Sequence, residues 1–229
     1  MNVAIIAAAG QGTRMAGKRP KQFLELAGKP ILFHTLEAFE QCDVIQEIIL
    51  VLPSQESAGF LALANKFGLR KLAKVVPGGA SRAQSVQQGL QAVREATAEI
   101  IAVHDGVRPF VTPDEIARTV ETARREGAAI MVTAPVDTIK EISEGSVVRT
   151  VKREALRNAL TPQCFQYKLL RRAYEGTDLT DPELTDESSL VERLGVRIAI
   201  VEGSSRNIKI TREEDLVIAE AILKQMDLC

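Results

Sequence analysis

Continuous apolar runs alternate with segments of helical spacing along most of the chain. Residues 3–7 and 48–52 are uninterrupted apolar runs, a pattern typical of strands buried on both faces of a parallel sheet. Between them, residues 30–39 have helical spacing with a proline in the first turn. Further helix and strand patterns alternate over residues 54–67, 72–76, 81–95, 100–103, 112–126 and 128–132. This alternation predicts an α/β fold, a three-layer α/β/α sandwich around a Rossmann-like, mainly parallel sheet.

The alternation stops after Pro135. Residues 137–142 and 147–151 flank the turn residues 143–146, which predicts a β-hairpin arm over residues 136–152. Neither strand has a clear apolar face, and an isolated two-stranded ribbon is marginal in water unless it packs on something, so a partner subunit is the obvious candidate. The chain then returns to helices near 166–174 and 187–194, a strand over 196–201 and a closing helix over 211–226. We expect a single domain spanning residues 1–229.

The overall composition excludes several classes of partner. The 229 residues include 29 Lys and Arg against 30 Asp and Glu, a net charge of −1, which is not that of a protein that coats a nucleic acid polymer. Aromatic residues make up 4% and tryptophan is absent, so a stacking surface for single-stranded nucleic acid is not expected. The remaining values, 45% hydrophobic and 26% charged, are those of an ordinary globular protein.

The cysteines and the N-terminal region predict a cytoplasmic protein that does not bind membranes. Cys42, Cys164 and Cys229 are far apart, and neither CxxC nor HExxH occurs, so we expect reduced structural thiols without a zinc site. The apolar run over residues 3–9 is too short for a signal peptide or a membrane-spanning helix.

The segment over residues 7–23 joins the first strand to the first long helix. It contains Gly10 and Gly12, and it lies where α/β folds bind ligands, at the carboxyl end of a parallel strand. Glycines let backbone N–H groups approach phosphate oxygens closely. Residues 1–36 contain five Lys or Arg residues and one Glu, a local charge of +4 in a chain of net charge −1. The segment therefore predicts a site for a polyanion.

Two common phosphate-binding loops do not fit this segment. No GxxxxGK[ST] occurs, and the third glycine position of the Rossmann fingerprint is Met15. The second predicted strand also lacks the ribose-binding carboxylate, which disfavours a nicotinamide oxidoreductase. A glycine pair alone favours an ordinary tight turn. With Arg14 and Lys21 in the same segment, a phosphate-binding loop is favoured over an ordinary turn, because two cations near bound phosphates can stabilise a phosphoryl or nucleotidyl transfer.

The same segment resembles the signature loop of pyrophosphorylase-type nucleotidyltransferases. The run from Ala7 to Met15 with Pro20-Lys21-Gln22-Phe23 is similar to the cytidylyltransferase branch, above all to the enzymes that act on 2-C-methyl-D-erythritol 4-phosphate. Other segments match in order along nearly the whole chain: residues 78–85, 103–110, 137–138, 161–163, 185–187, and 207–211 with 214–216. Each motif is weak alone, but their common order is specific.

The resemblance implies transfer of CMP from CTP to a sugar-alcohol phosphate, without a covalent enzyme intermediate. Arg14 and Lys21 would be catalytic cations that stabilise the α-phosphate as it is attacked. The nucleotide would lie along the glycine loop, at Ala8, Ala9, Gly10 and Gly12. A phosphate monoester is already nucleophilic at neutral pH, so such a site needs cations and alignment more than a general base.

Asp105 follows the predicted strand over 100–103, at the same sheet edge as the glycine loop if the sheet is parallel. A carboxylate there is a suitable ligand for Mg²⁺, the expected cofactor, which is usually shared with substrate phosphates. The alternative is a turn or capping aspartate. In the family that the chain resembles, the matching aspartate lines the active site and binds both substrates. Neighbouring His104 is expected to be a packed residue or one that supports a site residue without contacting the substrates.

The segment over residues 77–85 resembles the family's base-reading loop. Gly79 and Ser85 match the pattern and would bind CTP, whereas Ala80 stands where some relatives have an acidic residue. Base recognition would then depend on backbone groups and Ser85. The structural alternative is a plain turn before a helix, with Ser81 as its N-cap.

The acceptor phosphate needs cations of its own. By resemblance, Arg153 and Lys209 would be catalytic and would position the acceptor together with Asp105, Arg108, Thr138 and Thr161. Taken alone, Arg153 is more typical of a solvated charge. Lys209 lies between apolar residues in a predicted short strand, where an inward ammonium group requires a nearby anion. The family also forms homodimers through a hairpin arm, so Thr138 and Arg108 are among the residues that could act at the neighbouring subunit's site.

Two further alternatives remain. Ribitol-5-phosphate cytidylyltransferases share the glycine loop and Pro20-Lys21-Gln22-Phe23, but Ala7-Ala8-Ala9-Gly10 and Leu160 favour methylerythritol phosphate. A non-catalytic nucleotide-binding dimer would have lost Arg14 or Lys21, and both are present.

Overall fold

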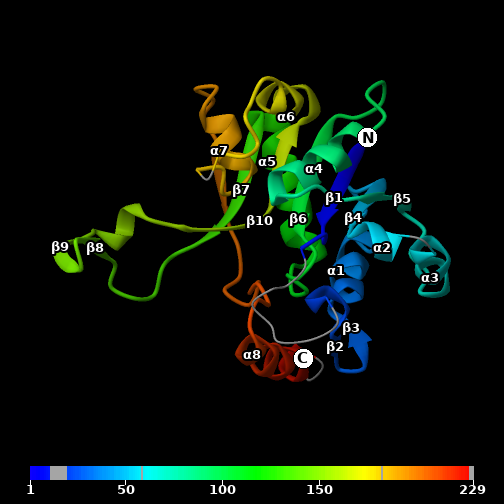
Figure 1. The fold of residues 1–229 in the computed structure, drawn as a ribbon, viewed down its shortest axis with the longest axis horizontal. Helices are drawn as coiled ribbons and strands as arrows, with labels where there is room; N and C mark the ends of the chain where they lie inside the picture. Colours follow the sequence, from blue (N-terminus) through cyan, green and yellow to red (C-terminus); the bar gives the residue numbers. More distant parts are fainter. Residues whose placement is uncertain (11–19, 58, 182, 227–229) are drawn as a thin grey trace.

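A computed structural model describes residues 1–10, 20–57, 59–181 and 183–226 (Figure 1). Its centre is a seven-stranded sheet in the order β11-β7-β10-β6-β1-β4-β5. The strands are β1 (Asn2–Ala7), β4 (Glu47–Leu52), β5 (Leu72–Pro77), β6 (Ile100–Asp105), β7 (Ala128–Thr133), β10 (Asn158–Gln166) and β11 (Ala199–Glu202). All the neighbouring pairs are parallel except those of β10, which runs antiparallel to β6 and β7. The mainly parallel sheet predicted from the sequence is confirmed.

Helices cover both faces of this sheet. The helices are α1 (Ile31–Glu40), α2 (Ser54–Ser57), α3 (Phe60–Lys66), α4 (Arg82–Gln91), α5 (Pro113–Glu126), α6 (Tyr167–Tyr174), α7 (Glu187–Glu192) and α8 (Glu213–Met226), with 3-10 turns at Lys21–Phe23 and Arg153–Ala155. Of these, α8 packs apart from the sheet, in a cluster with Leu26 and Ile31. Along β1, Ala4 and Ile6 join the core cluster under α1 and α5, whereas Val3 and Ile5 join the cluster under α4, α6 and α7. The continuous apolar run of β1 therefore reflects burial on both faces, as the three-layer prediction requires.

Three local predictions need correction. The sequence predicted no strand over β10, which the structure places in the interior of the sheet. The single helix predicted over residues 54–67 is two helices, and Gly59 before α3 has a φ of 80°, outside helical geometry. The short strand predicted around Lys209 is irregular chain.

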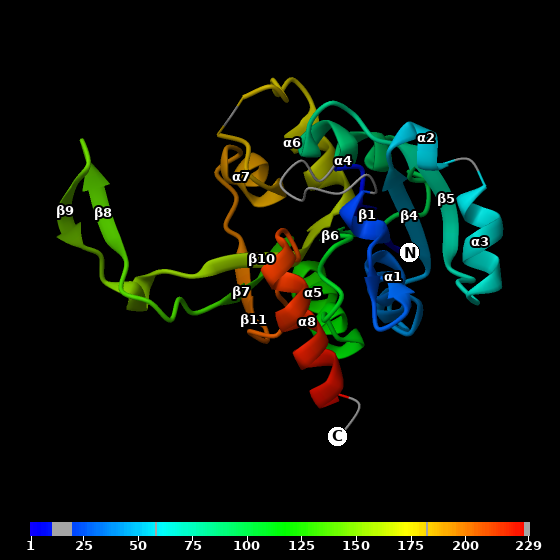
Figure 2. The same cartoon turned by 60° about the horizontal axis from the view of Figure 1, so that its bottom comes forward.

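The predicted hairpin is present as β8 (Lys140–Ser143) and β9 (Ser146–Thr150), which pair antiparallel. Its turn residues Glu144 and Gly145 have positive φ angles of 49° and 77°. The hairpin projects well away from the sandwich in both views, and every residue of its two strands is exposed (Figures 1 and 2). A smaller hairpin, β2 (Glu25–Leu26) with β3 (Lys29–Pro30), precedes α1. Across the described part of the chain, no helix has the length and apolar character needed to span a membrane.

Candidate functional site

A cavity of about 530 Å³ lies where β1 and β6 end and α4 begins. The glycine loop contributes Ala8, Ala9, Gly10 and, from the turn that follows, Lys21. The opposite side is formed by Gly79, Ser85, Asp105 and Lys209. The structure thus brings eight of the predicted site residues to one cavity. Gly12 and Arg14 lie outside the described residues.

The glycine loop is held to the sheet edge by backbone and side-chain hydrogen bonds. The Ala8 N–H donates to the Val51 carbonyl at 2.9 Å, and the Gly106 N–H donates to the Ala7 carbonyl at 2.9 Å. Gln22 is 1% exposed, and its amide donates to the Ala8 carbonyl at 2.7 Å. Gln22 therefore fixes the turn that carries Lys21 against the loop, a role that the sequence analysis did not assign.

The predicted base-reading loop packs directly on the glycine loop. Ser81 is the N-cap of α4 and forms a capping box with Gln84, as the structural alternative proposed. Ser85 accepts from the Gly79 N–H at 3.1 Å and donates to the Ser81 carbonyl at 2.8 Å. A β-carbon at Gly78 would lie 2.2 Å from that of Ala9, so only glycine permits this approach of the two loops. The loop is both a helix cap and a wall of the cavity.

Asp105 ends β6 and is surrounded by cations. Its side chain is 8% exposed, and its Oδ1 lies 3.0 Å from Arg82 Nε. Its Oδ2 lies 2.8 Å from Lys209 Nζ and 3.5 Å from Arg108 Nε. Although burial alone would raise the pKa of Asp105, Arg82 and Lys209 outweigh it and hold the pKa well below its usual range. The anion expected beside Lys209 is thus Asp105, although Lys209 lies in irregular chain and not in a strand.

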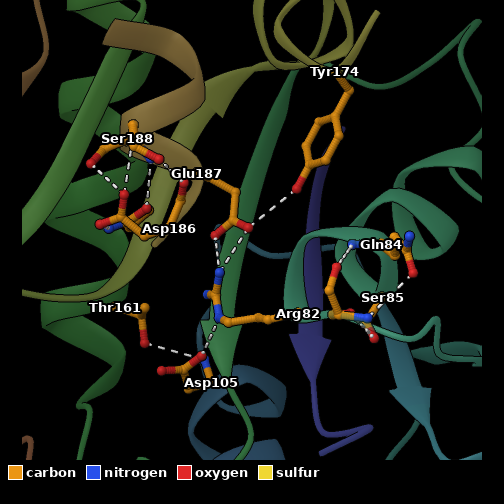
Figure 3. A network of polar contacts seen from close by, with 12 residues as sticks. Arg82, Gln84, Ser85, Asp105, Thr161, Tyr174, Asp186, Glu187 and Ser188 are labelled. Carbon is orange, nitrogen blue, oxygen red and sulfur yellow. Dashed lines mark hydrogen bonds and ion pairs between the residues drawn. The ribbon is translucent and has the colours of Figure 1, made fainter. Parts of the chain in front are cut away.

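Arg82 joins Asp105 to a second buried carboxylate, that of Glu187 (Figure 3). Arg82 Nη1 lies 2.8 Å from both oxygens of Glu187, and the Tyr174 hydroxyl donates to Glu187 at 3.2 Å. Asp186, the residue before Glu187, caps α7 by accepting from the Ser189 N–H. Arg82 and Glu187 lie in segments that resemble the family, residues 78–85 and 185–187, but neither residue was predicted to have a role. One signal was available, because a cation in the first turn of a helix opposes the helix dipole and calls for a specific anionic partner.

Thr161 and Arg108 also contact Asp105. The Thr161 hydroxyl accepts from the Asp105 N–H at 3.2 Å and pairs with His104 Nδ1 at 3.0 Å. Asn207 accepts from Arg108 Nη1 through its carbonyl at 2.8 Å and donates to the Thr161 carbonyl at 2.8 Å. His104 is fully buried, which lowers its pKa to about 4 and agrees with the packed role expected for it.

Thr138 and Arg153 lie elsewhere. They line a depression of about 390 Å³ at the base of the hairpin, together with Thr150, Lys152 and Glu154. Arg153 is exposed, and its Nη1 donates to the Val136 carbonyl at 2.7 Å. Neither residue lines the cavity at Asp105. The described chain therefore does not unite all the predicted acceptor residues in one place.

The residues at the cavity fit Mg²⁺ only as a site completed by substrate. Among the described residues, no group of three or more His, Cys, Asp or Glu side chains could hold a metal ion. Of the cavity-lining residues that the structure describes, only Asp105 has a carboxylate, and both of its oxygens contact cations. Because Mg²⁺ is commonly held by one or two carboxylates plus substrate phosphates, Asp105 is compatible with that mode and not with an all-protein site.

Comparison with known proteins identifies the family. The family model described as 2-C-methyl-D-erythritol 4-phosphate cytidylyltransferase matches residues 2–225. Relatives of that name from Halalkalibacterium halodurans and Bacillus cytotoxicus are 43% and 44% identical, over 97% of this chain and 97% and 98% of theirs. The crystal structure of 4-diphosphocytidyl-2C-methyl-D-erythritol synthase from Anaerococcus prevotii has a TM-score of 0.85 at 33% identity, covering 97% of this chain and 96% of that one. The Thermus thermophilus cytidylyltransferase has a TM-score of 0.78 at 35% identity, covering 96% and 98%. The chain belongs to the 2-C-methyl-D-erythritol 4-phosphate cytidylyltransferase family.

Proposed function

We infer that the chain transfers CMP from CTP to 2-C-methyl-D-erythritol 4-phosphate. The products are pyrophosphate and 4-diphosphocytidyl-2-C-methyl-D-erythritol, and the reaction is a step of non-mevalonate isoprenoid precursor biosynthesis. The observation that carries this function is the match of the family over residues 2–225. The cavity supports this function, because it is lined by Lys21, Lys209, the glycine loop and the predicted base-reading loop. Cations and backbone N–H groups in this arrangement suit a nucleoside triphosphate.

The proposed reaction is a single displacement at phosphorus. An oxygen of the acceptor phosphate bonds to the α-phosphorus of CTP, the bond to the β-phosphate oxygen breaks, and pyrophosphate leaves with that electron pair. The acceptor is already ionised at neutral pH, so no general base is needed. Lys21, with Arg14, would neutralise the charge that accumulates on the α-phosphate, and Lys209 would hold the acceptor phosphate in line.

Mg²⁺ remains a proposal for this chain. When bound, it would supply positive charge to the triphosphate, with Asp105 as its one protein carboxylate. Asp105 would also hold protein cations in place, because its negative charge keeps Arg82, Arg108 and Lys209 close together, two of them at the cavity wall. Without that charge, the cations would repel one another.

We further propose that the enzyme is a homodimer joined through the hairpin arm. The arm exposes Ile142, Val147 and Val148, whose side chains are 70%, 62% and 57% accessible. Thr138 and Arg153, predicted to bind the acceptor, lie at the base of the same arm. A second copy packed against the arm would bury the apolar side chains and bring these two residues to a cavity that its own chain leaves incomplete. We also propose a cytoplasmic location, which the unpaired, buried thiols of Cys42 and Cys164 support.

A pyrophosphate-release assay tests the function directly. Purified protein is given CTP and Mg²⁺ with either methylerythritol phosphate or ribitol 5-phosphate. We expect turnover with methylerythritol phosphate. Faster turnover of ribitol 5-phosphate would overturn the assigned acceptor, and no release with either acceptor would favour a non-catalytic nucleotide-binding protein.

A further inference from the structure

One guanidinium group, that of Arg82, forms ion pairs with two buried carboxylates from different parts of the chain. Arg82 is the first residue of α4, Asp105 ends β6 and Glu187 begins α7. The side chain of Arg82 is 29% exposed, whereas those of Asp105 and Glu187 are 8% and 1% exposed. Removing a carboxylate from water is costly unless a cation lies beside it. Arg82 is the cation that they share.

Glu187 fixes the orientation of Arg82. Both Glu187 oxygens accept from Arg82 Nη1, and Tyr174 donates a further hydrogen bond to the same carboxylate. With Nη1 engaged, the planar guanidinium directs Nε at Asp105 Oδ1. A lysine at this position would keep the charge, but it lacks the rigid fork that contacts two carboxylates at a set angle.

Arg82 in turn fixes Asp105. Because Arg82 holds Oδ1, the other oxygen, Oδ2, faces Lys209 at 2.8 Å. Lys209 lies in irregular chain, which is fixed by the buried Ile210 and its N–H hydrogen bond to the Val107 carbonyl. This backbone brings Lys209 to the cavity, and the Asp105 carboxylate is the anion that its ammonium group contacts there.

We propose that Arg82, held by Glu187 and Tyr174, is a positioning residue that fixes Asp105 and thereby places Lys209 against the reacting phosphates. This inference rests on the proposed cytidylyl transfer. The contacts of Arg82 with Asp105 and Glu187 in Figure 3 join α4, β6 and α7. According to the proposal, the same contacts also increase the rate of the chemical step. Arg82 also lines the cavity, so direct binding of CTP by Arg82 is the competing role that an experiment must separate.

The experiment compares Arg82→Lys, Glu187→Gln and the double variant with wild type. The measured quantities are kcat, the Kd for CTP and the thermal midpoint of unfolding. Arg118→Lys is the matched control, because Arg118 pairs with Asp114 on the exposed face of α5 and lies outside the cavity. We expect Arg82→Lys to lower kcat on the order of 100-fold, the effect of a reacting group displaced by about 1 Å, while Kd for CTP changes less than about threefold. Glu187→Gln lowers kcat in the same way, and the double variant is no slower than Arg82→Lys, because both changes break one chain of contacts.

Other outcomes would overturn the inference. A large increase in the Kd for CTP in Arg82→Lys, with kcat unchanged in Glu187→Gln, would mean that Arg82 binds CTP directly. Additive losses in the double variant would mean that the two residues act independently. If Arg82→Lys unfolds, Glu187→Gln and Tyr174→Phe, which keep Arg82, carry the test: Tyr174→Phe should lower kcat less than Glu187→Gln, because it removes one hydrogen bond to Glu187. Wild-type kcat in both variants would leave only a structural role. A wild-type protein without turnover would instead refute the proposed function.

Discussion

Gly78→Ala tests whether the contact between the two loops sets the shape of the cavity. The added β-carbon would lie 2.2 Å from the Ala9 β-carbon and 2.9 Å from the Ser85 hydroxyl. Carbon atoms in contact normally lie about 3.5–4.0 Å apart, so the loops must separate by roughly 1.5 Å. Overpacking of this kind costs about 1–3 kcal/mol of unfolding free energy. Because Ala9 lies on the cavity wall, we also expect kcat/KM for CTP to fall by roughly 100-fold.

The assays are pyrophosphate release and urea unfolding. Ala9→Gly combined with Gly78→Ala removes the closest contact and should restore most of the loss. Gly89→Ala is the matched control: its β-carbon would lie 2.6 Å from Ile5 Cγ2 under α4, and Gly89 is not part of the cavity wall. It should change stability but leave kcat/KM within about threefold of wild type. Wild-type kcat/KM and stability in Gly78→Ala, or no recovery in the double variant, would refute the reasoning.

Three further predictions concern catalysis, pH and assembly. Lys21→Ala should lower kcat far more than it weakens CTP binding, because the charge matters most in the transition state; near-normal kcat in single-turnover kinetics would exclude that role. His104 has a folded-state pKa of about 4 against an ordinary value of 6.5, so between these values the unfolded chain binds a proton that the folded chain does not. Lowering the pH from 7 to about 5 should therefore remove roughly 2 kcal/mol of unfolding free energy through this group, a loss that urea unfolding should not find in His104→Asn. Val148→Asp, which places a charge on the exposed arm, should shift sedimentation from dimer to monomer, whereas Val217→Asp on the exposed face of α8 should not.

Much of the fold followed from local pattern. β1 and β4 were predicted because burial on both faces leaves an uninterrupted apolar run, and α5 because a helix pattern occurs over residues 112–126. The structure adds that Thr112 and Glu115 form a capping box at the start of α5. β10 was missed because its buried positions include Thr161, Pro162 and Gln163, a polar and proline-containing pattern that argues against an interior strand. Its interior place depends on partners that are distant in sequence, which no local pattern reports.

The sequence identified site residues whose chemistry depends on their own side chain. It did not identify contacts between side chains that are distant in the chain. Asp105 and Lys209 were identified, but their contact required the topology that joins β6 to the chain before α8. Glu187 was overlooked because an acidic residue in the first turn of a helix is ordinary, and Arg82 because its anionic partners lie far away in the sequence. The local charge of +4 also overstated the site: Lys29, one of its five cations, pairs with Glu37 of α1 at 2.7 Å and does not line the cavity.

The interior position of β10 has a consequence for synthesis on the ribosome. β1, β4, β5 and β6 are complete at residue 105, so both loops of the cavity and Asp105 are made within the first half of the chain. β7 joins β6 only through β10, which ends at Gln166, and Lys209 follows later still. Because a domain generally folds as a unit, a nascent chain has an open sheet edge at β6 until β10 emerges. Lys209 is synthesised after β10, so the nascent protein gains its complete site only near the end of translation.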